Sequence, residues 1–462
     1  MLFSSITFLY IFIPVFFFIY YITKKKYRNT VILIGSLIFY LSGEPKYIII
    51  LLLSCIINYY ASTLLENKKY KKHRKKILIG SLIYNVGQLF IFKYLDFFID
   101  NINTILGLQI PFTRIVMPIG ISFFTFQALG YIIDVYMKKH KPASSVYEFA
   151  TYICLFPQLI AGPIVRYSDV KDDLKERTVS YNKFAEGVKR FTIGLGKKVL
   201  IANVMGEFVA AFTEVTVLSS WLKAIAFTLQ IYFDFSGYSD MAIGLGLMMG
   251  FKFLENFNYP FIAKNITDFW RRWHMSLSYW FRDYVYIPLG GNRGSFLKHI
   301  RNIFIVWFLT GFWHGASWNF IIWGLYFGII LVIEKLFLKK FLDKIKGFSH
   351  IYTLFIVIIS FMIFNAPSLN SIITELKSMF FISDIPLYTK ETIYLLKNYL
   401  VLIVVGIIAS TPLFKNVINK MTNTKLKYII DILEPVFYIL LLVICTSFLI
   451  DESYNPFLYF RF

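Results

Sequence analysis

The sequence is poor in charged residues. Only 16% of its 462 residues are charged and 57% are hydrophobic, whereas about 25% of the residues of an average soluble domain are charged. No charged residue occurs from position 302 to position 333. Because a helix that crosses a bilayer needs roughly 20 mostly apolar residues, this scarcity excludes an ordinary soluble protein and predicts an all-α polytopic membrane protein.

Cysteine is also scarce. The three cysteines, Cys55, Cys154 and Cys445, stand alone, with no C-x-x-C pair and no histidine at the spacing of metal ligands. This spacing supports neither a disulfide framework nor a zinc site. We expect no bound metal and no bound cofactor.

The start of the sequence lacks the features of a cleaved signal peptide. No positive charge precedes the apolar residues 1–22, and no small-residue cleavage site follows them. Lys24, Lys25 and Lys26 come directly afterwards. We predict a retained first span whose basic end lies in the cytoplasm.

Acidic residues are outnumbered, 27 against 48 basic residues, and the formal net charge is +21. Such a charge can indicate nucleic-acid binding, but here the basic residues gather between apolar segments: residues 24–28, 68–76, 138–141, 293–301, 335–346 and 415–427. Cytoplasmic loops of membrane proteins collect lysine and arginine. The clusters therefore predict a multi-pass topology with both termini outside, and no nucleic-acid partner.

The chain reads as one membrane domain in three parts: peripheral spans in 1–110, a core in 111–335 and further spans in 336–462. Apolar segments predict spans at residues 3–22, 30–42, 47–65, 77–94, 116–136, 351–365, 397–413 and 430–450. In the core, residues 147–165 are interrupted by prolines and a glycine, which predicts a re-entrant segment, and residues 169–190 are charged enough for the cytoplasmic face. No internal repeat of the kind found in many transporters is visible.

Seven of the eight tryptophans lie between Trp270 and Trp323. Within this region, helical periodicity over residues 265–293 predicts one amphipathic helix at the cytoplasmic interface, capped by Asn265. One face of this predicted helix is mainly aromatic and holds Trp270, Trp273, His274, Leu277, Phe281 and Tyr284. The other face is basic and holds Arg271, Arg272 and Arg282. His274 lies at the border, where it either makes an interfacial hydrogen bond or points into the protein.

Asp234 and Asp240 lie in the apolar stretch "QIYFDFSGYSDMAIG". Carboxylates at membrane depth are costly, so they are usually paired or face a cavity. Two interpretations stay open: a structural pairing with Arg271, Arg272 or Arg282, or a functional role. Gly237, between the aspartates, either breaks the helix or allows another backbone to approach closely.

His314 stands in "LTGFWHGASWNFIIWG", inside the charge-free region 302–333. An ionisable side chain at membrane depth is a functional-site hypothesis by default. Burial favours the neutral imidazole, which suits a general base acting on a thiol or hydroxyl. Trp313, Trp318 and Asn319 are interpreted either as pocket walls or as helix-packing residues.

Several motifs together resemble one protein family. These are "MPIGISFFTFQALGYIIDVY", "FPQLIAGPIVRY", the run from "YFDFSGYSD" through "DFWRRWHMSLSYWFRDYVYIPLGGNR", and "GFWHGASWNFIIWG". They resemble the membrane-bound O-acyltransferase family, in its bacterial alginate O-acetylase branch. The resemblance implies about eleven transmembrane or re-entrant helices around a central funnel or tunnel, in a bacterial cytoplasmic membrane.

The resemblance also implies roles for single residues. His314 would be the catalytic histidine and His274 the second family histidine. The predicted tunnel residues are Trp313, Trp318, Asn319, Asp234, Asp240 and Trp273, and the predicted donor-binding residues at the cytoplasmic mouth are Arg271, Arg272 and Arg282.

The implied reaction transfers an acetyl group from cytoplasmic acetyl-CoA across the membrane, for O-acetylation of an extracellular or cell-wall polysaccharide. A separate extracytoplasmic acetyltransferase of the SGNH type is the expected partner, because no such domain follows the last predicted span. D-alanyl transfer to teichoic acid is the nearest alternative. A membrane transporter that uses the histidines and aspartates as a relay is an alternative of another class.

The sequence ends in "DESYNPFLYFRF". Phe457, Tyr459 and Phe462 match the F-x-Y-x-x-F ending of small companion proteins in teichoic-acid D-alanylation. The match implies that Tyr459 carries the acyl group as an ester. The alternative is an aromatic belt at the membrane interface.

Overall fold

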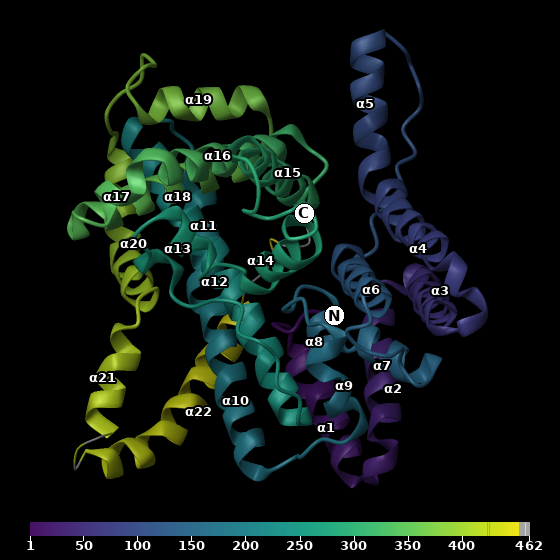
Figure 1. Ribbon diagram of the computed structural model, residues 1–462. Helices are drawn as coiled ribbons and strands as arrows, with labels where there is room; N and C mark the ends of the chain where they lie inside the picture. Colours follow the sequence, from purple (N-terminus) through teal and green to yellow (C-terminus); the bar gives the residue numbers. More distant parts are fainter. Residues whose placement is uncertain (423, 425, 452–457, 459–462) are drawn as a thin grey trace. The chain divides into compact units, whose positions relative to one another are not determined.

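The computed structural model describes residues 1–422, 424, 426–451 and 458, and every regular element among them is a helix (Figure 1). The described helices form two compact units, considered separately below. The first comprises residues 1–191 and 241–254, and the second residues 192–240 and 255–462. The prediction of an all-α polytopic protein is confirmed, while the division into three parts stays a prediction.

Six helical segments of the described residues are long and apolar enough to cross a membrane: Pro45–Glu66, Lys68–Leu106, Trp318–Leu342, Gly347–Asn365, Lys390–Ala409 and Lys427–Asp451. Two shorter apolar helices cover Phe8–Ile22 and Ile121–Tyr136. These segments include most of the predicted spans. The segment predicted at 77–94 is part of a much longer helix, because the chain stays helical through a π-turn at Phe90–Tyr94.

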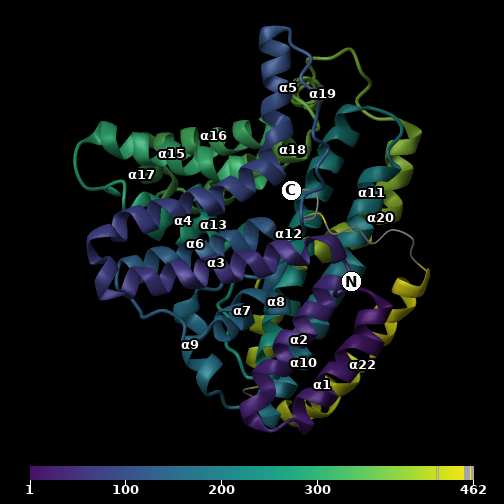
Figure 2. The ribbon, with the colours of Figure 1, turned by 90° about the vertical axis from the view of Figure 1, so that its right-hand side faces the viewer.

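The first unit contains these helices: α1 (Ile13–Ile22), α2 (Arg28–Leu41), α3 (Ile48–Glu66), α4 (Arg74–Leu89), α5 (Leu95–Leu106), α6 (Ile121–Tyr136), α7 (Val146–Cys154), α8 (Phe156–Leu159) and α9 (Tyr167–Lys175). The apolar α6 is almost wholly buried, and it packs against α3 and α4 (Figure 2). α7 in turn packs against α2 and α3.

The broken segment predicted at 147–165 is confirmed as a break in helix. α7 ends at Cys154, α8 is a single turn that begins beside Pro157, and residues after Leu159 leave the helical conformation. An added Cβ on Gly162 would lie 2.6 Å from the Cα of Gln158. The glycine therefore permits a backbone turn that a larger residue would prevent.

α12 is one continuous helix of 33 residues, Val217–Met249. Gly237 does not break it. An added Cβ there would lie 2.7 Å from the backbone oxygen of Gly194, which belongs to α10 (Tyr181–Gly196). Of the two interpretations of Gly237, the structure shows the close approach of two backbones.

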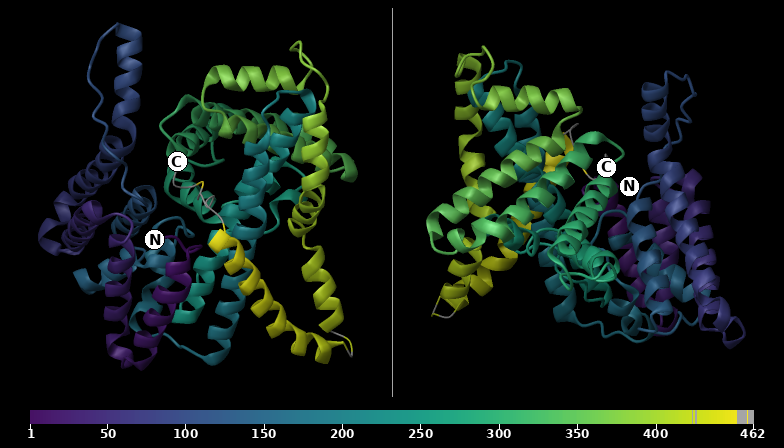
Figure 3. Two further views of the ribbon diagram at one scale, coloured as in Figure 1. Left: turned by 180° about the vertical axis from the view of Figure 1, so that it is seen from behind. Right: turned by 45° about the horizontal axis from the view of Figure 1, so that its top comes forward.

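The second unit continues with α11 (Val204–Ala211), α13 (Ile266–Trp270), α14 (Met275–Phe281), α15 (Phe296–His314), α16 (Trp318–Ile333), α17 (Lys339–Leu342), α18 (Lys346–Asn365), α19 (Leu369–Met379), α20 (Lys390–Ala409), α21 (Leu413–Thr422) and α22 (Lys427–Asp451). α20, α21 and α22 follow one another along the chain and are drawn in yellow-green and yellow (Figure 3). An aromatic core fills this unit.

α15 and α16 form a tight hairpin, and α18 packs on α16 (Figure 1). The hairpin is close because Gly311 and Gly324 face each other, with their Cα atoms near enough that any added Cβ would strike backbone. A β-carbon on Gly311 would collide with the carbonyl of Phe320. The hairpin therefore needs glycine at both positions.

Candidate functional site

His314 is the last residue of α15, and the chain turns to an extended conformation at Gly315. Its side chain is buried among rings. Trp323 of α16 and Phe364 of α18 present edges to the imidazole at centroid distances of 5.0 and 5.2 Å. The neighbouring Trp313 ring lies 5.0 Å away. Three helices of the second unit thus contribute to an aromatic surrounding for one titratable group.

Asn319 organises this surrounding from the first turn of α16. Its Nδ2 donates to the backbone oxygen of Phe364 at 3.0 Å, so it ties α16 to the end of α18 and holds Phe364 against His314. Trp313 is buried, whereas the Trp318 side chain is 48% exposed. The packing role proposed for Asn319 and Trp313 is thus visible, while a tunnel lined by these residues stays a prediction.

His274 lies between α13 and α14, so the prediction of one amphipathic helix over 265–293 is wrong. The Asn265 side chain does cap α13, by accepting from the Asp268 N–H at 2.7 Å. But α13 ends at Trp270, and His274 adopts left-handed backbone angles, φ 43° and ψ 53°. The break has a tertiary cause, because two backbone hydrogen bonds tie residues 272–275 to the loop at Asn256 and Asn258.

Asn256 determines which ring nitrogen of His274 carries the proton. Its Oδ1 accepts from the Ser276 N–H at 3.2 Å and from the Ser276 hydroxyl at 2.9 Å. Because a backbone N–H can only donate, this atom is the amide oxygen, and His274 Nδ1, 3.1 Å away, must donate to it. Burial lowers the pKa of His274 well below its ordinary value. The imidazole is therefore neutral, with its proton on Nδ1 and a lone pair on Nε2.

The two predicted histidines meet at one indole. The ring of Trp313 lies 6.1 Å from that of His274 and 5.0 Å from that of His314. His274 also receives the edge of Phe235 at 4.6 Å. Residues that are 40 positions apart in the chain are thus both brought next to the ring of Trp313.

Asp234 and Asp240 are paired, but with lysines rather than with the arginines predicted as structural partners. Asp234 Oδ1 lies 2.7 Å from Lys198 Nζ, and both side chains are almost fully buried. Asp240 Oδ2 lies 2.6 Å from Lys197 Nζ, in a more open position. Both lysines belong to a π-helical segment, Lys197–Asn203. Sequence reasoning missed them, although two lysines in the apolar stretch "FTIGLGKKVLIANV" were the available signal.

Asp234 makes a second contact, to a residue beyond α22. The backbone N–H of Leu458 donates to Asp234 Oδ2 at 2.9 Å. Leu458 is itself buried and belongs to the aromatic core of the second unit. Tyr459, the predicted acyl relay, lies outside the described residues, as do Phe457 and Phe462.

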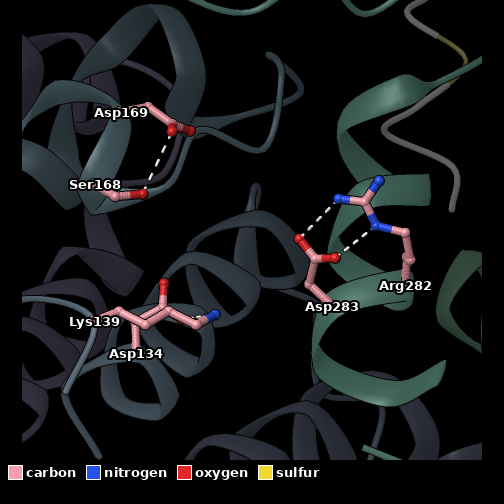
Figure 4. Close-up of polar contacts among 6 residues, drawn as sticks. All are labelled: Asp134, Lys139, Ser168, Asp169, Arg282 and Asp283. Atoms are coloured by element: carbon pink, nitrogen blue, oxygen red, sulfur yellow. Dashed lines mark hydrogen bonds and ion pairs between the residues drawn. The ribbon is translucent and has the colours of Figure 1, made fainter. Parts of the chain in front are cut away.

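The three predicted donor-binding arginines lie nearer the surface. Arg271 is exposed, Arg272 pairs with Asp268 at 3.0 Å, and Arg282 pairs with Asp283 through two contacts of 2.6 and 3.1 Å (Figure 4). Their role in binding a donor stays a prediction.

Trp273 is buried in the aromatic core, with Phe361 4.9 Å and Phe257 5.1 Å away. This position gives Trp273 a role in packing. Its predicted role as a tunnel residue stays a prediction. Among the described residues, no three His, Cys, Asp or Glu side chains gather as a metal would require.

Comparison with known proteins identifies the family. The sequence model of MBOAT, the membrane-bound O-acyltransferase family, matches residues 138–374, which include both histidines and both aspartates. The chain belongs to the membrane-bound O-acyltransferase family. The predicted family, and with it the enzyme class of acyltransferases, is therefore confirmed.

Curated relatives refine the placement. A probable alginate O-acetylase of Pseudomonas aeruginosa is 47% identical over 63% of this chain and 58% of its own length. One from Pseudomonas putida is 38% identical over 85% of both chains. A peptidoglycan O-acetyltransferase of Helicobacter pylori is 38% identical over 66% of this chain and 65% of its own. The chain thus spans about three fifths of the Pseudomonas aeruginosa relative.

Proposed function

We propose that this protein is an O-acyltransferase that moves an acetyl group from cytoplasmic acetyl-CoA across the membrane, for O-acetylation of an extracellular or cell-wall polysaccharide. The observation that carries the proposal is the placement of His314, buried at the end of α15 among the rings of Trp313, Trp323 and Phe364. Relatives of this chain are named for O-acetylation of alginate or of peptidoglycan.

In the proposed reaction, His314 is the general base. Its imidazole takes the proton of the acceptor hydroxyl while that oxygen bonds to the thioester carbonyl carbon. The carbon–sulfur bond then breaks, and the leaving thiolate of CoA takes the proton from the imidazolium. The products are one ester and one free thiol. A surrounding of rings excludes water, which would otherwise compete with the acceptor.

In this proposal His274, whose ring also lies near Trp313, assists His314. Because its proton is held on Nδ1 by Asn256, its Nε2 presents a hydrogen-bond acceptor rather than a donor. That orientation suits a group that aligns the acceptor hydroxyl or a water. Asn256 acts through His274 and is therefore a positioning residue.

The topology of the reaction is part of the proposal. The donor would enter from the cytoplasm, near Arg271, Arg272 and Arg282, and the acetyl group would leave at the outer face of a bacterial cytoplasmic membrane. Both termini would lie on that outer face. There a separate SGNH-type acetyltransferase would pass the group to the polysaccharide acceptor, and membrane lipid would surround the protein.

Tyr459 is the proposed intermediate carrier, its phenol oxygen being the hydroxyl that His314 deprotonates. The alternative for this residue is an aromatic belt at the interface. A Tyr459→Phe variant separates the two, since a belt tolerates the loss of one hydroxyl. Normal polysaccharide acetylation by that variant would eliminate the relay.

The decisive experiment uses the purified full chain in nanodiscs with acetyl-CoA labelled in the acetyl group. We expect time-dependent release of CoA and labelled acceptor, both lost in His314→Ala. His73→Ala is the matched control, because His73 is an exposed histidine of the first unit. Full activity of His314→Ala would refute the assignment of the base.

Transfer of a D-alanyl group is the second candidate. A teichoic acid D-alanyltransferase of Bacillus subtilis is 34% identical over half of this chain, and one of Streptococcus thermophilus is 32% identical. Both identities are lower than those to the acetylation relatives. Offering a D-alanyl thioester of a carrier protein beside acetyl-CoA distinguishes the donors. The transporter alternative loses its support, because the family is one of acyltransferases.

A further inference from the structure

The buried pair of Lys198 and Asp234 is not needed by the chemistry proposed above. Both side chains are nearly inaccessible, 3% and 1% exposed, and their charged atoms lie 2.7 Å apart. Taking two charges out of water costs more than a single contact returns, unless further hydrogen bonds satisfy the remaining lone pairs. The other carboxylate oxygen of Asp234 receives such a bond from the Leu458 N–H, at 2.9 Å.

This hydrogen bond joins parts of the chain that are far apart. Asp234 lies within α12, whereas Leu458 follows α22, the last helix. A buried backbone N–H in apolar surroundings needs a partner, and a carboxylate is the strongest acceptor that a side chain provides. Leu458 also buries its side chain, 3% exposed, in the aromatic core of the second unit. Polar and apolar contacts therefore hold the same residue.

The place of this contact relates it to the two histidines. The core that contains Leu458 also contains Trp323 and Phe364, the rings that contact His314. Phe235, the neighbour of Asp234 in sequence, contacts the ring of His274. Leu458 thus belongs to the same core as the rings of the candidate site.

We propose that Lys198 and Asp234 form a binding site for Leu458, which follows α22 in the chain, and that this anchor at Leu458 serves acyl transfer. Asp234 accepts the backbone N–H of Leu458, and Lys198, 2.7 Å from the other carboxylate oxygen, holds that carboxylate in place. Both are positioning residues. The part of the proposal that concerns acyl transfer rests on the proposed function, whereas the anchor itself does not.

The matched control is the neighbouring pair, Lys197 and Asp240. It has the same chemistry, an Nζ–Oδ2 distance of 2.6 Å and the same two secondary-structure elements, whereas the N–H of Leu458 donates to Asp234. One double variant combines Lys198→Met and Asp234→Leu. The control double variant combines Lys197→Met and Asp240→Leu, and we compare the two. Replacing both charges of a pair leaves no uncompensated charge in the interior.

Hydrogen–deuterium exchange of the full chain in nanodiscs measures the anchor directly, through overlapping peptides that differ by Leu458. We expect slow exchange of this amide in the natural sequence, and exchange faster by roughly tenfold or more when its charged acceptor is removed. The Lys197 and Asp240 variant should leave this exchange unchanged. Fast exchange in the natural sequence, or an equal increase in both double variants, would overturn the anchor.

A second pair of variants keeps the test decisive if the double variant does not fold. Leu458→Pro removes the donated N–H and leaves both charges in place, whereas Leu458→Ala keeps the N–H. We expect limited proteolysis to cleave the segment after α22 faster in Leu458→Pro than in Leu458→Ala. Equal cleavage of the two variants would show that the hydrogen bond does not hold the segment.

The link to acyl transfer needs its own readout. After incubation with labelled acetyl-CoA, we expect Leu458→Pro to carry less acetyl label on the peptide after α22 than Leu458→Ala. Equal labelling of the two would refute the positioning role. Absence of CoA release in the natural sequence would instead refute the proposed function, and the exchange experiment would still judge the anchor.

Discussion

The two histidines of the second unit are held in place by different means. His314 ends a long helix and is surrounded by rings from α15, α16 and α18. His274 sits at a break between two short helices, in left-handed backbone, with its ring hydrogen-bonded to Asn256. One imidazole is positioned mainly by helix packing, and the other by a loop that reaches it from elsewhere in the sequence. Each should therefore be sensitive to a different kind of substitution.

The largest effect is expected for His314→Ala. Loss of a general base typically lowers the rate by about 10²–10⁴-fold, and we expect a decrease of this size in acetyl transfer with little change in the melting temperature. The measurement is the initial rate of CoA release under saturating donor. A decrease of less than about tenfold would place the base elsewhere.

A change at Asn256 tests the hydrogen-bonded histidine. Asn256→Leu removes the acceptor of the His274 N–H and of two Ser276 donors. We expect about 10²-fold slower transfer from misplacement of the ring, and a loss of about 1–3 kcal/mol in unfolding free energy from the unsatisfied donors.

Asn256→Asp is the conservative control for that prediction, since a carboxylate oxygen can still accept from His274 and Ser276. We expect it to recover most of the rate. If the aspartate variant is as slow as the leucine variant, the tautomer of His274 is not what Asn256 contributes.

Substitution of Gly311 tests how helix packing positions His314. In Gly311→Ala the added methyl collides with the backbone of Phe320, so the hairpin must open. Overpacking of this kind typically costs about 1–3 kcal/mol, and His314, three residues further on, should move with the helix. Gly347→Ala is the control, because nothing lies within 4 Å of its added Cβ. Thermal unfolding and the acetyl-transfer rate, measured for both variants, test whether the effect is specific to Gly311.

The smallest effect is expected at the surface arginines. The Arg282 side chain is 54% exposed beside Asp283, and exposed pairs contribute about 0–1 kcal/mol. Arg282→Gln should therefore leave the unfolding free energy almost unchanged. If the arginines bind the donor, the KM for acetyl-CoA rises while kcat holds. An unchanged KM in Arg271, Arg272 and Arg282 variants would remove the donor role.

Much of the fold was predictable from local pattern. Long apolar segments indicate spans because a bilayer demands about 20 apolar residues whatever the tertiary structure, and prolines at 157 and 163 indicate a break for a similarly local reason. The single helix predicted over 265–293 does not form. Its periodicity is real, but tertiary hydrogen bonds override it. Two backbone hydrogen bonds, from the Met275 N–H to Asn256 and from the Asn258 N–H to Arg272, favour a left-handed turn at His274 over continued helix.

The site divides in the same way. His314, His274 and Asp234 stood out in the sequence because ionisable groups in apolar surroundings are costly and therefore informative. The partner of Asp234 did not stand out in the sequence. Whether Asp234 pairs with Lys198 or with one of the three arginines depends on which helices lie together. Gly237 shows why: only the approach of α10 to α12 brings the lysine segment alongside the aspartates.

By itself, the sequence determined the membrane character, the family motifs and the candidate site residues, since these follow from composition and local spacing. Only the tertiary structure decided that both histidines contact Trp313, that Asn256 holds the proton on one of them, and that Leu458 reaches Asp234. Contacts between distant residues depend on packing and on satisfying buried polar groups, and no local pattern specifies either.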